Sequence, residues 1–200
     1  MLKRISRTNR YIILGISLSM ILVYFVPIWY IGLTAPQYQD GLSMHIWVSE
    51  ITGGSEHDLR NINLLNHYVG MDEIHAESIP EFRYMPYVLG FMILGGLVAF
   101  LWPRMIMVYL GLINFALTAI AGMYDFWHWL YDYGHNLDPT APLQIADSFQ
   151  PPLIACKELL NFTACSWPNV GTFILLIAAG ALGYIVWKEL HRNKEQQHAP

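Results

Sequence analysis

Four apolar stretches divide the chain, and polar segments separate them. Each stretch is close to the roughly 20 apolar residues that a helix needs to cross a bilayer, so we expect four transmembrane helices. Pro27 is expected to kink the first helix near its end. The four stretches are 11–33, 86–102, 104–126 and 169–187.

Basic residues are scarce in two long polar segments, 34–85 and 127–168. Of the 11 basic residues, eight lie in 1–10, at Arg104 or in 188–200. The positive-inside rule therefore predicts that both termini are cytoplasmic and that the two long segments lie outside. The three basic residues of these outer segments are Arg60, Arg83 and Lys157.

The two outer segments carry short structural patterns of their own. Leu42–Ser49 alternates apolar and polar residues, which predicts a short strand. Asn61–Gly70 follows the candidate cap Asp58 and predicts a helix, whereas Gly53–Gly54 indicates a turn. A second short helix is expected over Cys156–Phe162. The overall expectation is an all-α membrane protein with four transmembrane helices and a mixed extracytoplasmic cap, in which the two outer segments pack together.

Composition supports this class and excludes others. Hydrophobic residues make up 54% of the chain and charged residues 13%, whereas about 25% of a typical soluble domain is charged. The lipid bilayer is therefore the expected surrounding. The net charge of −4 disfavours nucleic acid as a partner. Because the nucleophile elbow, the P-loop and the zinc-protease motif are all absent from the sequence, we expect no enzymatic activity.

Histidines on the outer side provide a first candidate metal site. His67, Met71 and His75 follow one another at four-residue steps, which places them on one face if the helix continues. His45, on the predicted strand, is a further candidate ligand. Imidazole and thioether groups together favour copper. The alternative is a polar surface with scattered histidines and with Met71 in a small core.

A second candidate site lies at the outer end of the third apolar stretch. Asp125, His128, Asp132 and His135 are spaced by three, four and three residues, which places them on one helical stripe. Ionisable residues near a membrane usually face an interior cavity, so we expect this stripe to point inward beneath the cap. His128 is the strongest candidate for a metal ligand, with Asp125 or Asp132 to orient its ring. The alternative is a structural polar network without metal.

Two cysteines, Cys156 and Cys165, lie on the outer side in the predicted topology. An oxidising compartment allows a disulfide between them. Copper ligation by their thiolates, or two unpaired cysteines, are the alternatives that the sequence leaves open.

Several short sequence blocks are distinctive, and they lie in the two outer segments and at the end of the third apolar stretch. They are Gly41–His45, Asn61–Met71, Tyr124–Phe126, Tyr131–Pro139, Gln150–Leu153 and Leu159–Phe162. In these blocks the chain resembles small multi-pass membrane proteins that are encoded beside nitrous-oxide reductase and its copper-maturation genes in some bacteria. The resemblance implies a bacterial inner membrane, periplasmic outer loops and a place in copper delivery or electron supply.

These observations together predict an accessory membrane protein with a periplasmic or membrane protein partner. It would handle copper or assist the maturation and function of a periplasmic copper enzyme, with nitrous-oxide reductase as the first candidate. The outer histidines and Met71 would coordinate the copper. One alternative is a metal-free respiratory subunit that docks an electron carrier, because three basic and 13 acidic residues give the outer side a net charge of −10. The other is a purely structural assembly subunit.

Overall fold

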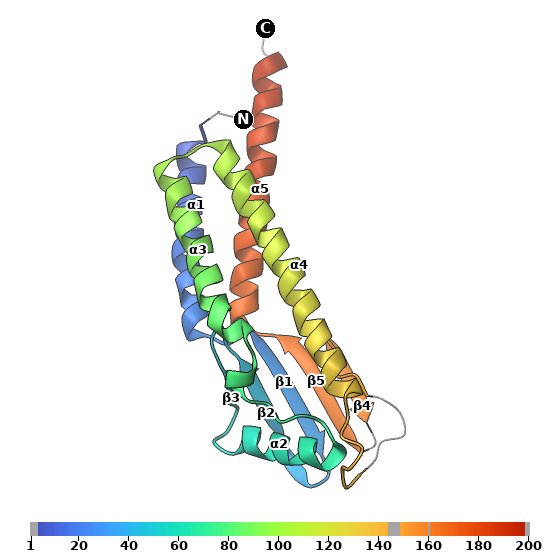
Figure 1. Ribbon diagram of the computed structural model, residues 1–200. Coiled ribbons are helices and arrows are strands. Elements are labelled where there is room, and N and C mark those ends of the chain that lie inside the picture. The colour runs from blue at the N-terminus through green and yellow to red at the C-terminus, as the bar shows by residue number, and fades with distance from the viewer. Residues whose placement is uncertain (1–3, 144–148, 160, 199–200) are drawn as a thin grey trace.

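The computed structural model describes residues 4–143, 149–159 and 161–198. Within them, four helices are long and apolar enough to cross a membrane, as expected from the hydropathy pattern. Figure 1 shows these helices side by side in a bundle, with the start of α1 and the end of α5 at one end and a β-sheet at the other. The four candidate spans are Arg7–Phe25, Glu81–Leu101, Met105–His135 and Val170–Arg192.

The first apolar stretch is helical for only part of its length. Helix α1 (Arg7–Met20) continues as the 3-10 helix η1 (Ile21–Phe25), which ends before Pro27. Strand β1 then begins at Trp29. The prediction of one kinked span over 11–33 is therefore wrong at its outer end. Proline removes a backbone donor and disfavours helical geometry in the preceding residue, so the helix ends there rather than bending.

Five antiparallel strands form one sheet in the order β3-β2-β1-β5-β4. The all-α expectation is therefore wrong, because the outer segments contain more strand than their sequence pattern indicated. The predicted strand at Leu42–Ser49 is confirmed with shifted ends, whereas the helix predicted at Cys156–Phe162 is wrong because its described residues belong to the β4–β5 hairpin. The strands are β1 (Trp29–Ala35), β2 (Tyr38–Ile46), β3 (Ile51–Gly53), β4 (Ala155–Leu159) and β5 (Phe162–Pro168).

The sheet is joined directly to the bundle through its two central strands. Strand β1 follows η1, and β5 leads into α5 (Val170–His198). The backbone N–H of Asn169 donates to the oxygen of Ile28 at 2.9 Å, and the N–H of Gly171 donates to the oxygen of Pro27 at 2.9 Å. The antiparallel hydrogen bonds therefore continue to the point where η1 ends and α5 begins, which fixes the sheet relative to α1 and α5.

Helix α2 (Asp58–Val69) covers one face of the sheet. The predicted helix at Asn61–Gly70 is thus confirmed, with an earlier start and with Gly70 as its left-handed cap at φ +82°. Leu42 and Met44 of β2 are buried against this helix, and the intervening residues belong to the opposite face, as a period of two requires. The small core between α2 and the sheet therefore depends on alternation along β2.

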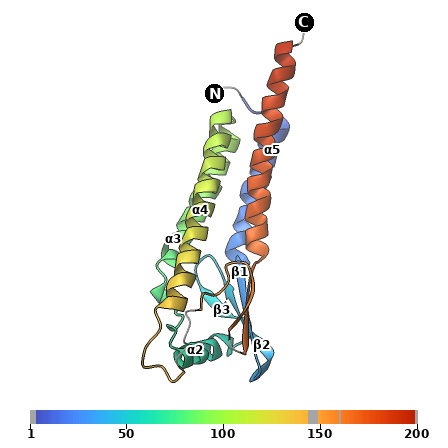
Figure 2. The same ribbon diagram turned by 90° about the vertical axis from the view of Figure 1, so that its right-hand side faces the viewer.

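Helices α3 (Glu81–Leu101) and α4 (Met105–His135) form the other half of the bundle. At 1.5 Å per residue, the 31 residues of α4 extend about 46 Å, which exceeds the roughly 30 Å hydrocarbon core of a bilayer. The last turns of α4 reach the sheet and α2 (Figures 1 and 2), where Trp129 and Tyr133 pack against the core between α2 and the sheet. The helix predicted at 104–126 therefore continues to His135, beyond the length that a membrane span needs.

The two outer segments pack on each other, as predicted. The backbone N–H of Asp138 donates to the oxygen of Gly70 at 2.8 Å, and that of Leu143 donates to the oxygen of Tyr68 at 3.1 Å. We call the sheet, α2 and the last turns of α4 from Tyr124 onward, together with their connections, the cap.

Candidate functional site

The stripe Asp125, His128, Asp132 and His135 lies on the open surface of α4. Asp125 and His128 are exposed, and Asp132 and His135 are half-buried. The prediction that the stripe points into a polar cavity beneath the cap is therefore wrong for the described structure. The burial of charged groups is costly, and on α4 a competing apolar stripe occupies the inward position.

That inward stripe consists of Phe126, Trp129, Leu130 and Tyr133, at steps of three and four residues. Leu130 is 1% exposed, and the rings of Trp129 and Tyr133 stack with centroids 5.1 Å apart. Both stripes have helical periodicity, so spacing alone does not decide which one is buried. The transfer free energy of the aromatic and aliphatic side chains decides it.

Two contacts organise the exposed stripe. His128 Nδ1 lies 3.1 Å from Asp132 Oδ2, with the two side chains 55% and 47% exposed. His135 Nδ1 lies 2.8 Å from the backbone oxygen of Tyr131, and its ring stacks on the Tyr131 ring at 3.9 Å. Each histidine therefore has one ring nitrogen held by an oxygen, which orients the ring and leaves the other nitrogen toward the surroundings.

Exposed aromatic side chains surround this stripe. Tyr124, Trp127 and Tyr131 are all exposed, and the Tyr124 ring lies 6.2 Å from the His128 ring. Such amphipathic rings are enriched both at membrane interfaces and in the contact surfaces of protein complexes. The stripe and these rings form the α4 face, defined here as Tyr124, Asp125, Trp127, His128, Tyr131, Asp132 and His135.

The predicted ligand set of His67, Met71 and His75 is not assembled on one helical face. Gly70 ends α2 in a left-handed conformation, so the register is lost after His67. His67 is exposed, Met71 is 8% exposed within the cap core, and His75 faces Glu73 at 2.8 Å. The alternative interpretation, with scattered surface histidines and Met71 in a small core, describes the structure.

His45 lies apart from these residues. It belongs to the face of the sheet opposite the neighbouring Met44, where its ring is 5.4 Å from the Tyr30 ring and Nδ1 is 3.5 Å from Asn169 Nδ2. Because the sheet separates His45 from Met71, the two cannot share one metal ion. Among the described residues, no group of three or more His, Cys, Asp or Glu side chains is placed to hold a metal.

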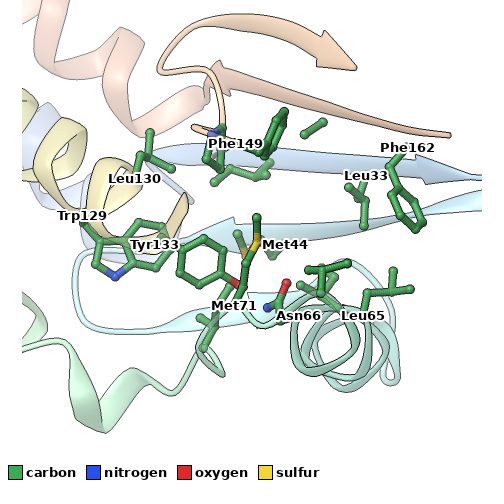
Figure 3. Close-up of a pocket in the computed structure, with 16 residues that line it drawn as sticks. Leu33, Met44, Leu65, Asn66, Met71, Trp129, Leu130, Tyr133, Phe149 and Phe162 are labelled. Atoms are coloured by element: carbon green, nitrogen blue, oxygen red, sulfur yellow. The ribbon is translucent and has the colours of Figure 1, made fainter. Parts of the chain in front are cut away.

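The sequence did not reveal an apolar cavity of about 90 Å³ in the cap (Figure 3). Its walls come from the sheet, α2, the loop after α2 and the inward stripe of α4, and they include Met44, Met71 and Trp129. None of the described lining side chains is charged. The Tyr133 hydroxyl is buried near Asn66 without a well-formed hydrogen bond. The alternation of β2 and the spacing of the aromatic residues of α4 are the sequence signals from which these walls could have been predicted.

Cys156 and Cys165 form a disulfide across the β4–β5 hairpin, with their Cα atoms 4.0 Å apart. This settles the alternatives that the sequence left open, because disulfide sulfurs are not thiolate copper ligands. In β5 the buried Ala164 and Ser166 alternate with Cys165, a period of two that is incompatible with the predicted helix. The hairpin therefore serves the stability of the cap.

The Asp58 carboxylate connects α2 to β2. It accepts the backbone N–H of Ser43 at 3.0 Å and the hydroxyl of Ser55, and it is not the helix cap that the sequence suggested, since that position is His57. Burial acts to raise the pKa of Asp58, but the hydrogen bonds from Ser55 and Ser43 outweigh it and the pKa is lowered. The ionised carboxylate is thus part of the folded cap.

No protein-family model matches the chain, and no curated protein matches it either.

Proposed function

We propose that the chain is an accessory membrane protein that assists a periplasmic copper enzyme, with the α4 face as the surface that meets the partner and passes copper. Nitrous-oxide reductase is the first candidate partner, on the basis of the sequence resemblance. The single observation that carries the proposal is the exposed His128–Asp132 pair among exposed aromatic side chains.

The geometry of the pair supports transient copper handling. If Asp132 accepts the proton of His128 Nδ1, then Nε2 carries a free lone pair that can ligate a metal. His135, two helical turns further along the same stripe, is held in the same manner by the Tyr131 carbonyl. Two imidazoles on an open helix surface bind copper weakly and reversibly, which suits transfer better than storage.

The partner would complete the coordination. The described residues of this chain supply too few close ligands for a closed site, whereas an interface can contribute the remaining ligands from the second protein. Tyr124, Trp127 and Tyr131 would provide rigid contact area around the histidines, as aromatic anchors do in protein interfaces.

The proposal requires the cap to face the periplasm and both termini to face the cytoplasm. The distribution of basic residues supports this orientation. Single cysteines introduced at the exposed positions Glu56 and Thr140 should react with an impermeant maleimide in intact spheroplasts, and one at position 195 should react only after lysis. A cysteine at Glu56 that is protected until lysis would contradict the orientation.

Copper binding tests the role of the stripe. Wild-type protein in detergent should bind Cu(I) or Cu(II) in competition with a chromophoric chelator, and His128→Ala should weaken this binding by about tenfold, since it removes a ligand. His57→Ala is the matched control, because His57 is an exposed histidine of the cap outside the α4 face. Equal copper affinity in the wild type and His128→Ala would overturn the role of His128.

A second candidate function is supported by the charge of the cap. Glu50, Glu56, Asp72 and Glu73 are exposed there, and the predicted outer segments together with Asp125 have a net charge of −10. Such a surface attracts a basic electron carrier by electrostatic steering. Binding of a basic cytochrome that weakens steeply with salt, in protein free of copper, would favour this function over copper handling.

A further inference from the structure

Two arginines meet at the end of the bundle opposite the cap. Arg4 and Arg104 are partners in an isolated antiparallel bridge between the segment before α1 and the turn before α4. The backbone N–H of Ile5 donates to the oxygen of Pro103 at 2.9 Å and flanks the pair. Because the hydrogen bond flanks the two arginines, they form a non-hydrogen-bonded antiparallel pair. The Cα atoms of such a pair are typically about 4.5 Å apart, and the two side chains lie on the same side of the ladder.

This arrangement places the backbone positions of two cationic residues directly opposite each other. Like charges at opposed positions of a ladder are destabilising unless an anion neutralises them. Neither guanidinium forms an ion pair with a described carboxylate. The Arg104 guanidinium lies over the Trp102 ring, 4.7 Å from its centroid, which fixes its position without reducing its charge.

Other features at this end add positive potential. The chain has no acidic residue before Asp40, and none between Glu81 and Asp125. Helix α4 begins directly after Arg104, with no acidic residue in its first turn and no side-chain cap, so the positive end of its dipole faces the same region.

A buried carboxylate at this end of the bundle is already engaged. Glu189 of α5 is 1% exposed, accepts the Ser6 N–H at 2.9 Å and the Asn9 side-chain amide at 2.8 Å, and pairs with Arg192 at 2.6 Å. It holds the start of α1 against α5 and is neutralised by Arg192. It is therefore not the counter-ion of the Arg4–Arg104 pair.

An apolar surface continues from the arginine pair along the bundle. Tyr11 of α1 and Leu101 of α3 are 65% and 72% exposed, and Trp102 at the turn is exposed as well. In a helix of membrane-spanning length, these side chains face acyl chains, and a tryptophan at the end of the span marks the headgroup level.

We propose that Arg4 and Arg104 bind the phosphate of an anionic phospholipid, whose acyl chains run along the exposed apolar surface beside Tyr11 and Leu101. Each guanidinium offers a planar fork that matches two phosphate oxygens, so two of them can share one phosphodiester. The phosphate replaces the missing counter-ion of the pair, and the bound lipid fastens the segment before α1 to the α3–α4 turn.

Lipid titration of the purified full chain in mild detergent tests this site. Thermal unfolding is followed while dioleoyl phosphatidylglycerol or dioleoyl phosphatidylcholine is added. The wild type should show an apparent affinity about tenfold higher for phosphatidylglycerol, given the energy of one to two arginines near an anionic headgroup. The double variant Arg4→Gln/Arg104→Gln should lose this preference.

The control is Arg60→Gln/Arg83→Gln, which removes the same charge at the cap end of the molecule and should keep the preference. Equal wild-type affinity for the two lipids would overturn the proposal, and this result needs no variant to fold. A preference that survives in Arg4→Gln/Arg104→Gln would also overturn it. Inorganic phosphate that stabilises the protein as strongly as phosphatidylglycerol, at equal concentration, would show a free-anion site instead of a lipid site.

Discussion

The bundle and the cap differ in where their apolar side chains lie and in the contacts that stabilise them, although the chain passes through both regions several times. In the bundle, large apolar side chains such as Leu117 and Leu176 are exposed, at 63% and 58%, because lipid is the expected solvent. In the cap, apolar side chains are buried by alternation and helical periodicity, and a disulfide and specific hydrogen bonds hold the parts together. Truncation of an exposed apolar side chain in the bundle should therefore change stability little, whereas truncation of a buried one in the cap should lower it strongly.

The largest difference in stability between the two regions is expected for leucine-to-alanine substitutions at two positions of α4. Leu130→Ala removes a side chain that is 1% exposed and borders the cap cavity, so it should lower the free energy of unfolding of the cap by about 2–4 kcal/mol. Leu117→Ala, on the exposed part of α4, should change stability in detergent by less than about 0.5 kcal/mol. Thermal or denaturant unfolding followed by hydrogen exchange of the cap measures both. Equal losses would contradict the distinction.

Loss of the disulfide should affect the cap alone. Cys156→Ser/Cys165→Ser should lower cap stability by about 2–3 kcal/mol, since the bond closes a short loop of the hairpin. The helix content measured by far-ultraviolet circular dichroism should stay unchanged, because the spans do not depend on this bond. Treatment of the wild type with a reductant is the control and should reproduce the variant; a wild type indifferent to reduction would argue against this role.

The Asp58 contact should make the cap sensitive to acid. Because the pKa of Asp58 is lowered in the folded state, the ionised carboxylate contributes stability above its unfolded pKa, and this contribution is lost as the pH falls through the lower folded value. Asp58→Asn should thus lower cap stability by about 1 kcal/mol at neutral pH. The difference from wild type should vanish at acidic pH. A difference that stays constant from neutral pH to pH 3 would show that the charge of Asp58 is irrelevant.

The sequence was a better guide to the bundle than to the cap, for physical reasons. A span is recognised by its average hydropathy, which tolerates an error of several residues at each end, as α4 shows by continuing to His135. Which face of a helix is buried depends on the side chains of both faces. On α4 the face with Leu130 and Tyr133 packs inward, and Asp125 and His128 are exposed. Averages do not contain this information.

Within the cap, the sequence revealed the elements that have a local pattern and missed those that depend on long-range pairing. The alternation of β2 and the periodicity of α2 were visible because each is a local pattern. Strand β5 was not, since its pairing with β1 joins residues more than 120 positions apart along the chain. Helix α2 ends at Gly70, and the glycine itself is a sequence signal for this end. The helical spacing between His67 and Met71 is therefore interrupted.

Direct binding to the proposed partner tests the central claim most directly. Purified wild-type protein in detergent and His128→Ala/Asp132→Asn are compared for binding to immobilised nitrous-oxide reductase, with His57→Ala as the folded control. The account predicts saturable binding by the wild type and by His57→Ala, and affinity at least about tenfold weaker in the double variant, as expected when a central contact is lost. The absence of wild-type binding, or equal affinity in the double variant, would contradict the claim that the α4 face serves a copper enzyme.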